Sequence, residues 1–332
     1  MESISLPLVS IGVPVFNGEK SLFYALNSLL EQDYPNIEII ISDNGSTDTT
    51  PEICRKFAQK DARVKYYRSE KNLGSIWNFN RVFEISIGKY FMWAAHDDLR
   101  EPTFISECVK KMEQCPDAVL CQTYTAVFRE GREEVMYVAH LDSFEHIPGL
   151  VERYWETLNR FPATAIYGLY RSSAIRKTHI LTKSIATDLA FIQEFSIYGK
   201  FIQVPKVLFK YIGRKKWNTI HDDYRVFFGI NKKPWWYLPF VVLFFNHWKR
   251  VSHASIPFLI KLRLQGLLIE YEIRHVILMV FIKVTGSFCP DRLKEKIGCA
   301  IYWRWMHNPN VKVESEDLYL DRVIKPMLGW WE

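Results

Sequence analysis

Two adjacent carboxylates, Asp97 and Asp98, follow directly after the apolar run Tyr90–Ala95. Neighbouring carboxylates at the mouth of a strand repel each other unless a cation lies beside them. Mg²⁺ and Mn²⁺ prefer oxygen ligands and are commonly held by one or two protein carboxylates together with phosphate oxygens. The pair could therefore hold a divalent cation that neutralises a diphosphate leaving group. The alternative interpretation is a solvated turn in which Asp98 begins a helix near Glu101.

Two further polar clusters have the same position relative to a strand. Pro14-Val15-Phe16-Asn17 follows the apolar run Leu8–Val13, and Asp43-Asn44-Gly45-Ser46 follows the run Ile37–Ser42. The carboxyl ends of parallel strands meet at one edge of a sheet, which is where such sheets bind ligands. The sequence therefore predicts that three segments distant in the chain form one site.

The elements that would position these clusters alternate between strand and helix. Short apolar runs predict buried strands, whereas apolar residues three and four apart predict amphipathic helices. Strands that alternate with crossover helices indicate an α/β fold with a mainly parallel sheet and helices on both faces. The predicted strands span residues 8–13, 37–42, 64–67 and 90–95; the predicted helices span residues 19–31 and 75–87, with another that ends near residue 60.

The second half of the chain has a less regular pattern. Strands are predicted at 119–128 and 201–211, the latter as a strand or hairpin, and helices at 149–158, 187–198 and about 257–284. A boundary near Gly213 would divide the chain into an α/β domain of residues 1–212 and a basic, aromatic-rich region of residues 213–332 that is mostly helical.

The order of these motifs resembles glycosyltransferase family 2, whose members have the GT-A fold, a Rossmann-like α/β architecture. The resemblance runs from about Leu8 to Tyr211 and depends on four motifs: P-x-x-N after the first strand, the turn SDNGSTDTT, N-x-G before a helix, and the acidic pair after the fourth strand. It implies an inverting, metal-dependent enzyme that transfers a sugar from a nucleotide sugar to a hydroxyl acceptor. It also implies Mn²⁺ or Mg²⁺ as cofactor and a UDP-sugar as the commonest donor.

The resemblance also assigns roles to individual residues. Asp98 would be the metal ligand, and Asp97 would contact ribose or metal-bound water. The family's D-x-D motif begins here with His96, which either supports the metal site or is simply packed. The residues expected to contact the nucleotide sugar are Pro14, Phe16, Asn17, Asp43, Asn44, Asn72, Gly74 and Asp97.

An inverting transfer needs a base that accepts the proton of the attacking hydroxyl. In the family this base is an Asp or Glu at a helix start, after an apolar segment that contains Gly and Arg; here Gly168–Ile175 precedes Asp188. Asp188 is therefore the expected catalytic base. Glu194 is a weaker candidate because it lies almost two turns farther along the same helix. The alternative for Asp188 is an acid that only stabilises the helix N-terminus.

The chain becomes basic and aromatic toward its C-terminus. Residues 206–307 contain 18 Lys and Arg against 6 Asp and Glu, which points to a local partner surface. Residues 234–248 carry no charge and adjoin Lys249 and Arg250, but they are fewer than the roughly 20 that span a bilayer. Residues 234–284 therefore suit either peripheral contact with an anionic membrane or packing and dimerisation of a helical subdomain. Membrane contact would fit a polyprenyl-linked or other glycan acceptor at the cytoplasmic face.

Four basic residues precede that stretch, and they could clamp a pyrophosphate or simply form a basic surface loop. They are Arg214, Lys215, Lys216 and His221.

Other features narrow the function class. The six cysteines include no C-x-x-C pair, so reduced thiols are expected, and Met1–Leu6 lacks a signal-peptide pattern, which favours a cytoplasmic protein. A nucleotidyltransferase would need a Gly- and Arg-rich phosphate loop after the first strand, and residues 13–17 (VPVFN) do not form one. The basic residues form no recognition motif for nucleic acid, which is not expected as a partner. A non-catalytic scaffold with the same fold stays open because of His96.

Overall fold

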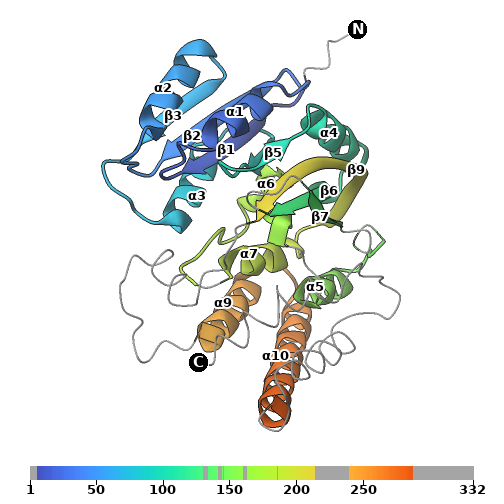
Figure 1. Cartoon of the computed structure of the whole chain (residues 1–332). Coiled ribbons are helices and arrows are strands. Elements are labelled where there is room, and N and C mark those ends of the chain that lie inside the picture. The colour runs from blue at the N-terminus through green and yellow to red at the C-terminus, as the bar shows by residue number, and fades with distance from the viewer. Residues whose placement is uncertain are drawn as a thin grey trace.

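A computed structural model describes residues 6–129, 134–140, 144, 146–159, 163–184, 186–213 and 239–286. A single mixed sheet lies at its centre, and helices cover both of its faces (Figure 1). This arrangement confirms the predicted α/β fold. The four clamp candidates, Arg214, Lys215, Lys216 and His221, lie outside the described residues, and so does the start of the 234–248 stretch.

Four parallel strands form one half of the sheet in the order β3-β2-β1-β4. In β1, Val9, Ile11 and Val13 enter one core, whereas Gly12 lies on the other face, where an added Cβ would come within 2.6 Å of Val82. Burial on both faces explains why these strands appear in the sequence as unbroken apolar runs. Their bounds are β1 Val9–Val15, β2 Ile37–Asp43, β3 Val64–Arg68 and β4 Tyr90–Trp93.

The other half of the sheet mixes strand directions. β8 lies antiparallel between β4 and β6, and β9 runs parallel to β6 along most of its length. The short β5 pairs with β9 directly after the acidic pair, so Asp98 does not begin a helix; the next helix begins at Phe104. The bounds are β5 Leu99–Arg100, β6 Ala118–Arg129, β7 Val135–Ala139, which pairs with β6, β8 Leu169–Arg171 and β9 Lys200–Gly213.

Two apolar cores hold the helices against the sheet. α1, α2 and α4 cover one face, and α3, α6 and α7 cover the other. At the centre of the second core the Trp93 ring contacts Phe91, Tyr170 and Phe191, and its Nε1 donates a hydrogen bond to Phe79 O at 2.9 Å. The end of β4 is thereby fixed. The helices are α1 Leu22–Leu30, α2 Thr50–Lys60, α3 Ser75–Glu84, α4 Phe104–Gln114, α6 Ser172–Ile175 and α7 Thr187–Phe195.

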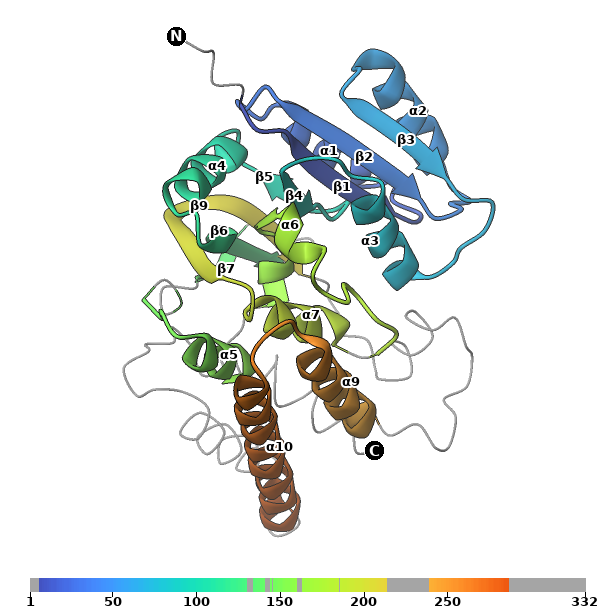
Figure 2. The same ribbon diagram turned by 180° about the vertical axis from the view of Figure 1, so that it is seen from behind.

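A third core joins the C-terminal helices to the rest of the molecule. Tyr154 and Leu158 of α5 pack with Val251 at the end of α9 and with Leu264 and Leu268 of α10. Figures 1 and 2 show both C-terminal helices on the side of α5 and α7, with α10 projecting away from the sheet. Within the described ranges, none of the helices combines the length and the hydropathy required to cross a bilayer. The remaining bounds are α5 Leu150–Asn159, the 3-10 helix η1 Ala163–Tyr167, α9 Pro239–His253 and α10 Phe258–Gly286.

Candidate active site

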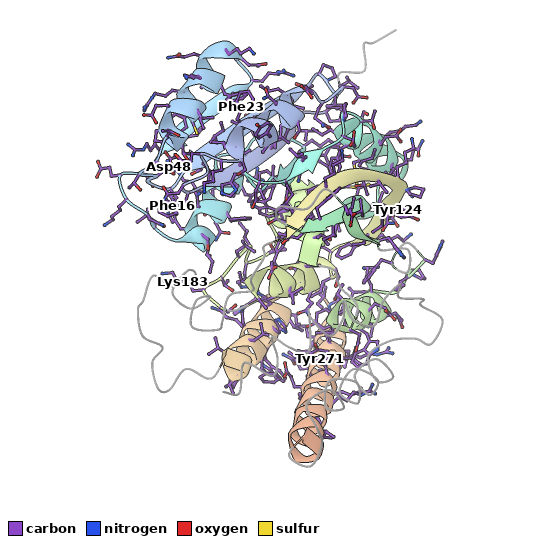
Figure 3. The ribbon with its side chains drawn as sticks, viewed as in Figure 1. Phe16, Phe23, Asp48, Tyr124, Lys183 and Tyr271 are labelled. Carbon is purple, nitrogen blue, oxygen red and sulfur yellow. The ribbon has the colours of Figure 1, made fainter. Side chains whose placement is uncertain are left out.

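The first three strands end at the same level of the sheet. Val15 of β1 is paired with Asp43 of β2, and Asp43 is paired with Arg68 of β3. The main chain of Asn44 donates to Val15 O at 2.9 Å, so the polar clusters that follow β1 and β2 are in contact. In Figure 3, the labelled side chains of Phe16 and Asp48 lie together at this end of the strands.

Asp43 is fully buried and held by three donors. Its Oδ1 accepts the Ser46 N–H at 2.8 Å, and its Oδ2 accepts the Tyr66 hydroxyl at 2.9 Å and Arg68 Nε at 3.2 Å. Burial, together with the Asp43 carboxylate, raises the pKa of Tyr66 well above its ordinary value, so the phenol stays a donor. A carboxylate has about four acceptor positions. By this count one position has no donor among the described residues, although the side chain is fully buried here.

The side chain of Asn44 ties the second-strand turn to the loop before α3. Its Nδ2 donates to Asn72 Oδ1 at 2.9 Å and to Gly74 O at 3.0 Å. Gly45, with φ of 76°, packs so closely on this loop that an added Cβ would lie 2.7 Å from its main chain. The structure thus brings Asn44, Asn72 and Gly74 together, and they hold one another in place.

The cluster after β1 contains one buried and two exposed residues. Pro14 is buried within β1, whereas Phe16 is 41% exposed and its ring is accessible from outside. Asn17 has a left-handed main chain with φ of 52°, and its Oδ1 accepts the Thr47 N–H at 2.9 Å. Of the two exposed residues, Phe16 is the one whose side chain can stack.

Asp98 is the most unusual carboxylate of the group. It is 1% exposed; its Oδ1 accepts the Ile212 N–H at 3.0 Å, and its buried Oδ2 has no hydrogen-bond partner among the described residues. Burial, then the charge of Asp97, raises the pKa of Asp98 to about 8. An unsatisfied buried oxygen costs free energy unless a ligand completes it. A divalent cation, which prefers carboxylate oxygen, fits this position.

The neighbours of Asp98 limit how many ligands the protein could supply. Asp97 is partly exposed, and its Oδ1 lies 3.4 Å from His96 Nδ1. The His96 ring also packs against Gly18, so His96 both packs and contacts the acidic pair. Over the ranges that the structure describes, no three His, Cys, Asp or Glu side chains gather as a metal site. A cation here would therefore take most of its ligands from phosphate and water.

Arg100 is a buried cation beside the acidic pair that the sequence did not reveal as part of the site. Its Nη2 donates to Trp93 O at 2.9 Å, and its guanidinium lies 4.7 Å from the centre of the Phe209 ring. Burial lowers the pKa of Arg100 to about 10, while its charge favours the ionised form of Asp98. The sequence offers no usable signal for it, because β5 has only two residues.

Asp188 lies in the first turn of α7, and burial raises its pKa. Tyr167, which is not among the predicted site residues, relates Asp188 to the acidic pair. Burial first, and then charges that include those of Asp98, Asp97 and Asp188, raise the pKa of Tyr167. All three carboxylates therefore lie within electrostatic range of one tyrosine.

Glu194, the weaker candidate for the base, is engaged elsewhere. It is 1% exposed, its Oε2 lies 2.5 Å from Arg250 Nη1, and its Oε1 lies 2.7 Å from His179 Nδ1. A carboxylate with one oxygen in an ion pair and the other in contact with a histidine ring has little capacity to accept a proton from a substrate. Asp188 is therefore the remaining candidate for the base in α7.

Comparison with known proteins places this site in a family. A family model described as glycosyl transferase family 2 matches residues 10–179, which is more than half of the chain. The chain belongs to glycosyltransferase family 2. The matched segment contains every predicted site residue of this family member except Asp188.

Curated relatives of this family 2 protein are glycosyltransferases of bacteria. An uncharacterised glycosyltransferase of Rickettsia typhi is 27% identical, covering 65% of this chain and 65% of its own length. GlyG of Streptococcus pneumoniae is 32% identical, covering 35% of this chain and 39% of its own length. The chain thus spans less than two-thirds of the length of these relatives.

Solved structures show the same fold. TarS of Staphylococcus aureus in complex with UDP is 18% identical, with a TM-score of 0.58 over 80% of this chain and 71% of that one. A mannosyltransferase of Pyrobaculum calidifontis in complex with GDP-Man and Mn²⁺ is 14% identical, with a TM-score of 0.53 over 99% of this chain and 88% of that one. The expected GT-A fold of this family 2 chain is thereby confirmed.

Proposed function

We propose that this family 2 protein is an inverting, metal-dependent glycosyltransferase that moves a sugar from a nucleoside diphosphate to a hydroxyl acceptor. The observation that carries the proposal is the buried oxygen of Asp98 that has no hydrogen-bond partner within the described part of the chain. The charges of Asp97, Asp98 and Asp188 all act on Tyr167, which supports it. A transfer reaction of this kind needs a cation site at the diphosphate and a base at the acceptor, close to each other.

The nucleoside would bind at the ends of β1 and β2. Phe16 is exposed enough to pack on a base, and Asp43 would accept a uracil N–H or a ribose hydroxyl, which requires its buried side chain to become accessible. Pro14 and Asn17 would shape the wall of this pocket. Asn44, Asn72 and Gly74 would form the loop over the donor, and their mutual hydrogen bonds preorganise it. A UDP-sugar is the donor we propose; TarS was solved with UDP and with UDP-GlcNAc.

Asp98 would bind Mn²⁺ or Mg²⁺ through its unsatisfied oxygen, and Asp97 would contact ribose or metal-bound water. Such a cation, when bound, neutralises the charge of the departing diphosphate. The nearby guanidinium of Arg100 favours the ionised form of Asp98, which is the form that binds a cation.

Asp188 would accept the proton of the acceptor hydroxyl as that oxygen attacks the anomeric carbon. Burial raises the pKa of Asp188, which makes it a stronger base than an exposed aspartate. A single displacement by the acceptor oxygen inverts the configuration at the anomeric carbon. No covalent enzyme intermediate is then needed.

We further propose that the acceptor is a glycan or lipid-linked glycan and that α9 and α10 contact the cytoplasmic face of a membrane. Phe258 and Leu259 are 70% and 77% exposed, although both are large and apolar. Exposed Lys249 and Arg263 lie one helical turn from exposed apolar residues, as expected for contact with anionic lipid.

Vesicle flotation tests the membrane contact. The Phe258→Ser/Leu259→Ser variant should lose binding to vesicles of phosphatidylglycerol and phosphatidylcholine. Phe23→Ser is the matched control, since Phe23 is also exposed but belongs to α1, away from α9 and α10 (Figure 3). Equal flotation of wild type and both variants would refute this contact.

The enzyme proposal is tested by a thermal-shift screen of nucleotide sugars with and without Mn²⁺, followed by turnover assays. We expect one donor to stabilise the protein more when Mn²⁺ is present and to be consumed by it. A non-catalytic scaffold would consume no donor with either cation, and its donor binding would be insensitive to Asp98→Ala.

A further inference from the structure

The segment before α7, described for residues 180–184 and 186, has an unfavourable main-chain conformation at two places. Ile180 and Ala186 have φ angles of 50° and 47°, in the left-handed region that favours glycine. For residues with a side chain, and above all for a β-branched one, such conformations are unfavourable. They persist only when neighbouring groups hold them. Asp188 lies two residues after Ala186, the second of these positions.

Helix α9 supplies the groups that hold this segment. Arg250 Nη2 donates to Ile180 O at 2.8 Å and to Thr182 Oγ1 at 3.0 Å. Asn246 Nδ2 donates to Thr182 Oγ1 at 2.9 Å and to Ser184 Oγ at 2.7 Å. Arg250 Nε also donates to Asn246 Oδ1 at 3.1 Å. Because Asn246 and Arg250 are one turn apart, they present their side chains to the segment as a single polar face.

The same contacts lead back to the helix that carries Asp188. Arg250 and Glu194 are each 1% exposed and form an ion pair at 2.5 Å, which joins α9 to α7. Thr187, the first residue of α7, accepts the Thr182 N–H at 2.7 Å through its Oγ1. The first turn of α7 is therefore connected to α9 both through its own helix and through the segment before it.

A third attachment comes from the donor side of the molecule. Asn80 of α3 donates from Nδ2 to Leu181 O at 2.8 Å and accepts the Leu181 N–H at 3.2 Å through Oδ1. α3 begins directly after Gly74, at the end of the loop proposed to cover the donor. The segment therefore spans from the donor loop to the C-terminal helices, with Asp188 at its end.

We propose that Asn246 and Arg250 of α9 are positioning residues that keep the segment before α7, and with it the Asp188 carboxylate, in the geometry required for transfer. The proposal rests on the base role proposed for Asp188. It assigns α9 a part in the reaction that is separate from any membrane contact, because these two side chains face the catalytic domain.

The first test compares Asn246→Ala with Ser252→Ala. Asn246 contacts the segment, whereas Ser252, on the same helix, bonds to Gln265 of α10 and to its own helix. Misplacement by about 1 Å can lower a rate by about 100-fold, so kcat of Asn246→Ala should fall by roughly 10- to 100-fold with the Kd for UDP unchanged. Ser252→Ala should keep its kcat. Equal kcat values for the two variants would overturn the proposal.

The second test separates positioning from stability. In Glu194→Leu/Arg250→Met the buried ion pair is replaced by apolar groups of similar size, which often leaves stability unchanged or increased. The hydrogen bonds from Arg250 to Ile180 and Thr182 are still lost. We therefore expect this double variant to have a midpoint of urea unfolding near that of wild type but a kcat at least 10-fold below that of wild type. If the double variant had both the stability and the kcat of wild type, the Glu194–Arg250 pair would be only structural, which would overturn the proposal.

A third measurement does not depend on activity. Lys183 is exposed within the segment (Figure 3), so trypsin can report how firmly the segment is held. Cleavage after Lys183 should be faster in Asn246→Ala and in the double variant than in wild type and Ser252→Ala. If wild type transferred no sugar from any donor, the proposed function would fail, while the cleavage rates would still show whether Asn246 and Arg250 hold the segment. Equal cleavage rates would overturn it.

Discussion

Replacing Asp98 by Asn should make the metal-free protein more stable while abolishing its response to a cation. In the folded chain the pKa of Asp98 is about 8, against an ordinary value of 3.8. At pH 7 the unfolded chain is therefore ionised and the folded chain mostly protonated, which costs folding at most about 4 kcal/mol at about 1.4 kcal/mol per pH unit. Burial of the amide offsets part of this gain. We expect Asp98→Asn to raise the free energy of unfolding by about 2 kcal/mol.

The charge of Arg100 changes this expected gain in stability little. Arg100 loses a carboxylate in the variant, but at pH 7 that carboxylate is mostly neutral in the metal-free protein. A raised pKa gives stability that is present below pH 3.8 and lost as the pH rises toward 8. The advantage of Asp98→Asn should thus be small near pH 4 and grow steadily up to pH 8.

Urea unfolding in EDTA at pH 5 and pH 7 measures the effect directly, and a second series with Mn²⁺ and UDP measures ligand stabilisation. Wild type should be the less stable protein in EDTA and should gain from Mn²⁺ with UDP, whereas Asp98→Asn should gain far less. If the variant is equally or less stable than wild type at both pH values, the carboxylate does not carry the burial cost inferred for it.

Three further outcomes are expected. Asp188→Asn should lower kcat at least 100-fold with an unchanged Kd for UDP. In wild type, kcat should fall with decreasing pH through a pKa above that of an ordinary aspartate, since burial raises the pKa of Asp188. A pH-independent kcat would contradict the base role. Asp43→Ala should cost about 1–3 kcal/mol in urea unfolding, because Tyr66 and Arg68 lose their acceptor, and should abolish UDP binding in calorimetry. Phe16→Ala should change stability by less than about 0.5 kcal/mol yet weaken UDP binding by about 1 kcal/mol or more, and calorimetry showing equal affinity would exclude base stacking.

The parallel half of the fold was predictable from sequence because its strands are buried on both faces. The run Ile37–Ser42 predicts β2 to within one residue, and the polar cluster beginning at Asp43 then has only one edge of the sheet to occupy. The same reasoning applies to Asp98 after β4. Local pattern was sufficient at these positions because strand direction alone brings the clusters together.

The rest of the site depends on contacts that no local pattern reveals. β5 has two residues and β8 has three, too few to show a period. Arg100 is buried because Phe209, more than 100 positions later, lies against it.

Arg250 shows the same limit more strongly. Beside an apolar stretch it suggested a side chain at a membrane interface, but it is 1% exposed and paired with Glu194. The membrane hypothesis therefore depends on other residues, such as Phe258 and Leu259. Tertiary pairing decided the orientation of Arg250, and the sequence around it does not contain that information.

The proposed chemistry requires a divalent cation that binds at Asp98 and contacts the donor diphosphate there. Crystals grown with UDP and Mn²⁺, measured at the manganese absorption edge, test it most directly. We expect an anomalous peak about 2 Å from Asp98 Oδ2 that also contacts the diphosphate, with the uracil against Phe16 and Asp43. Manganese bound away from Asp98, or UDP bound at this edge of the sheet with no cation between it and Asp98, would contradict it.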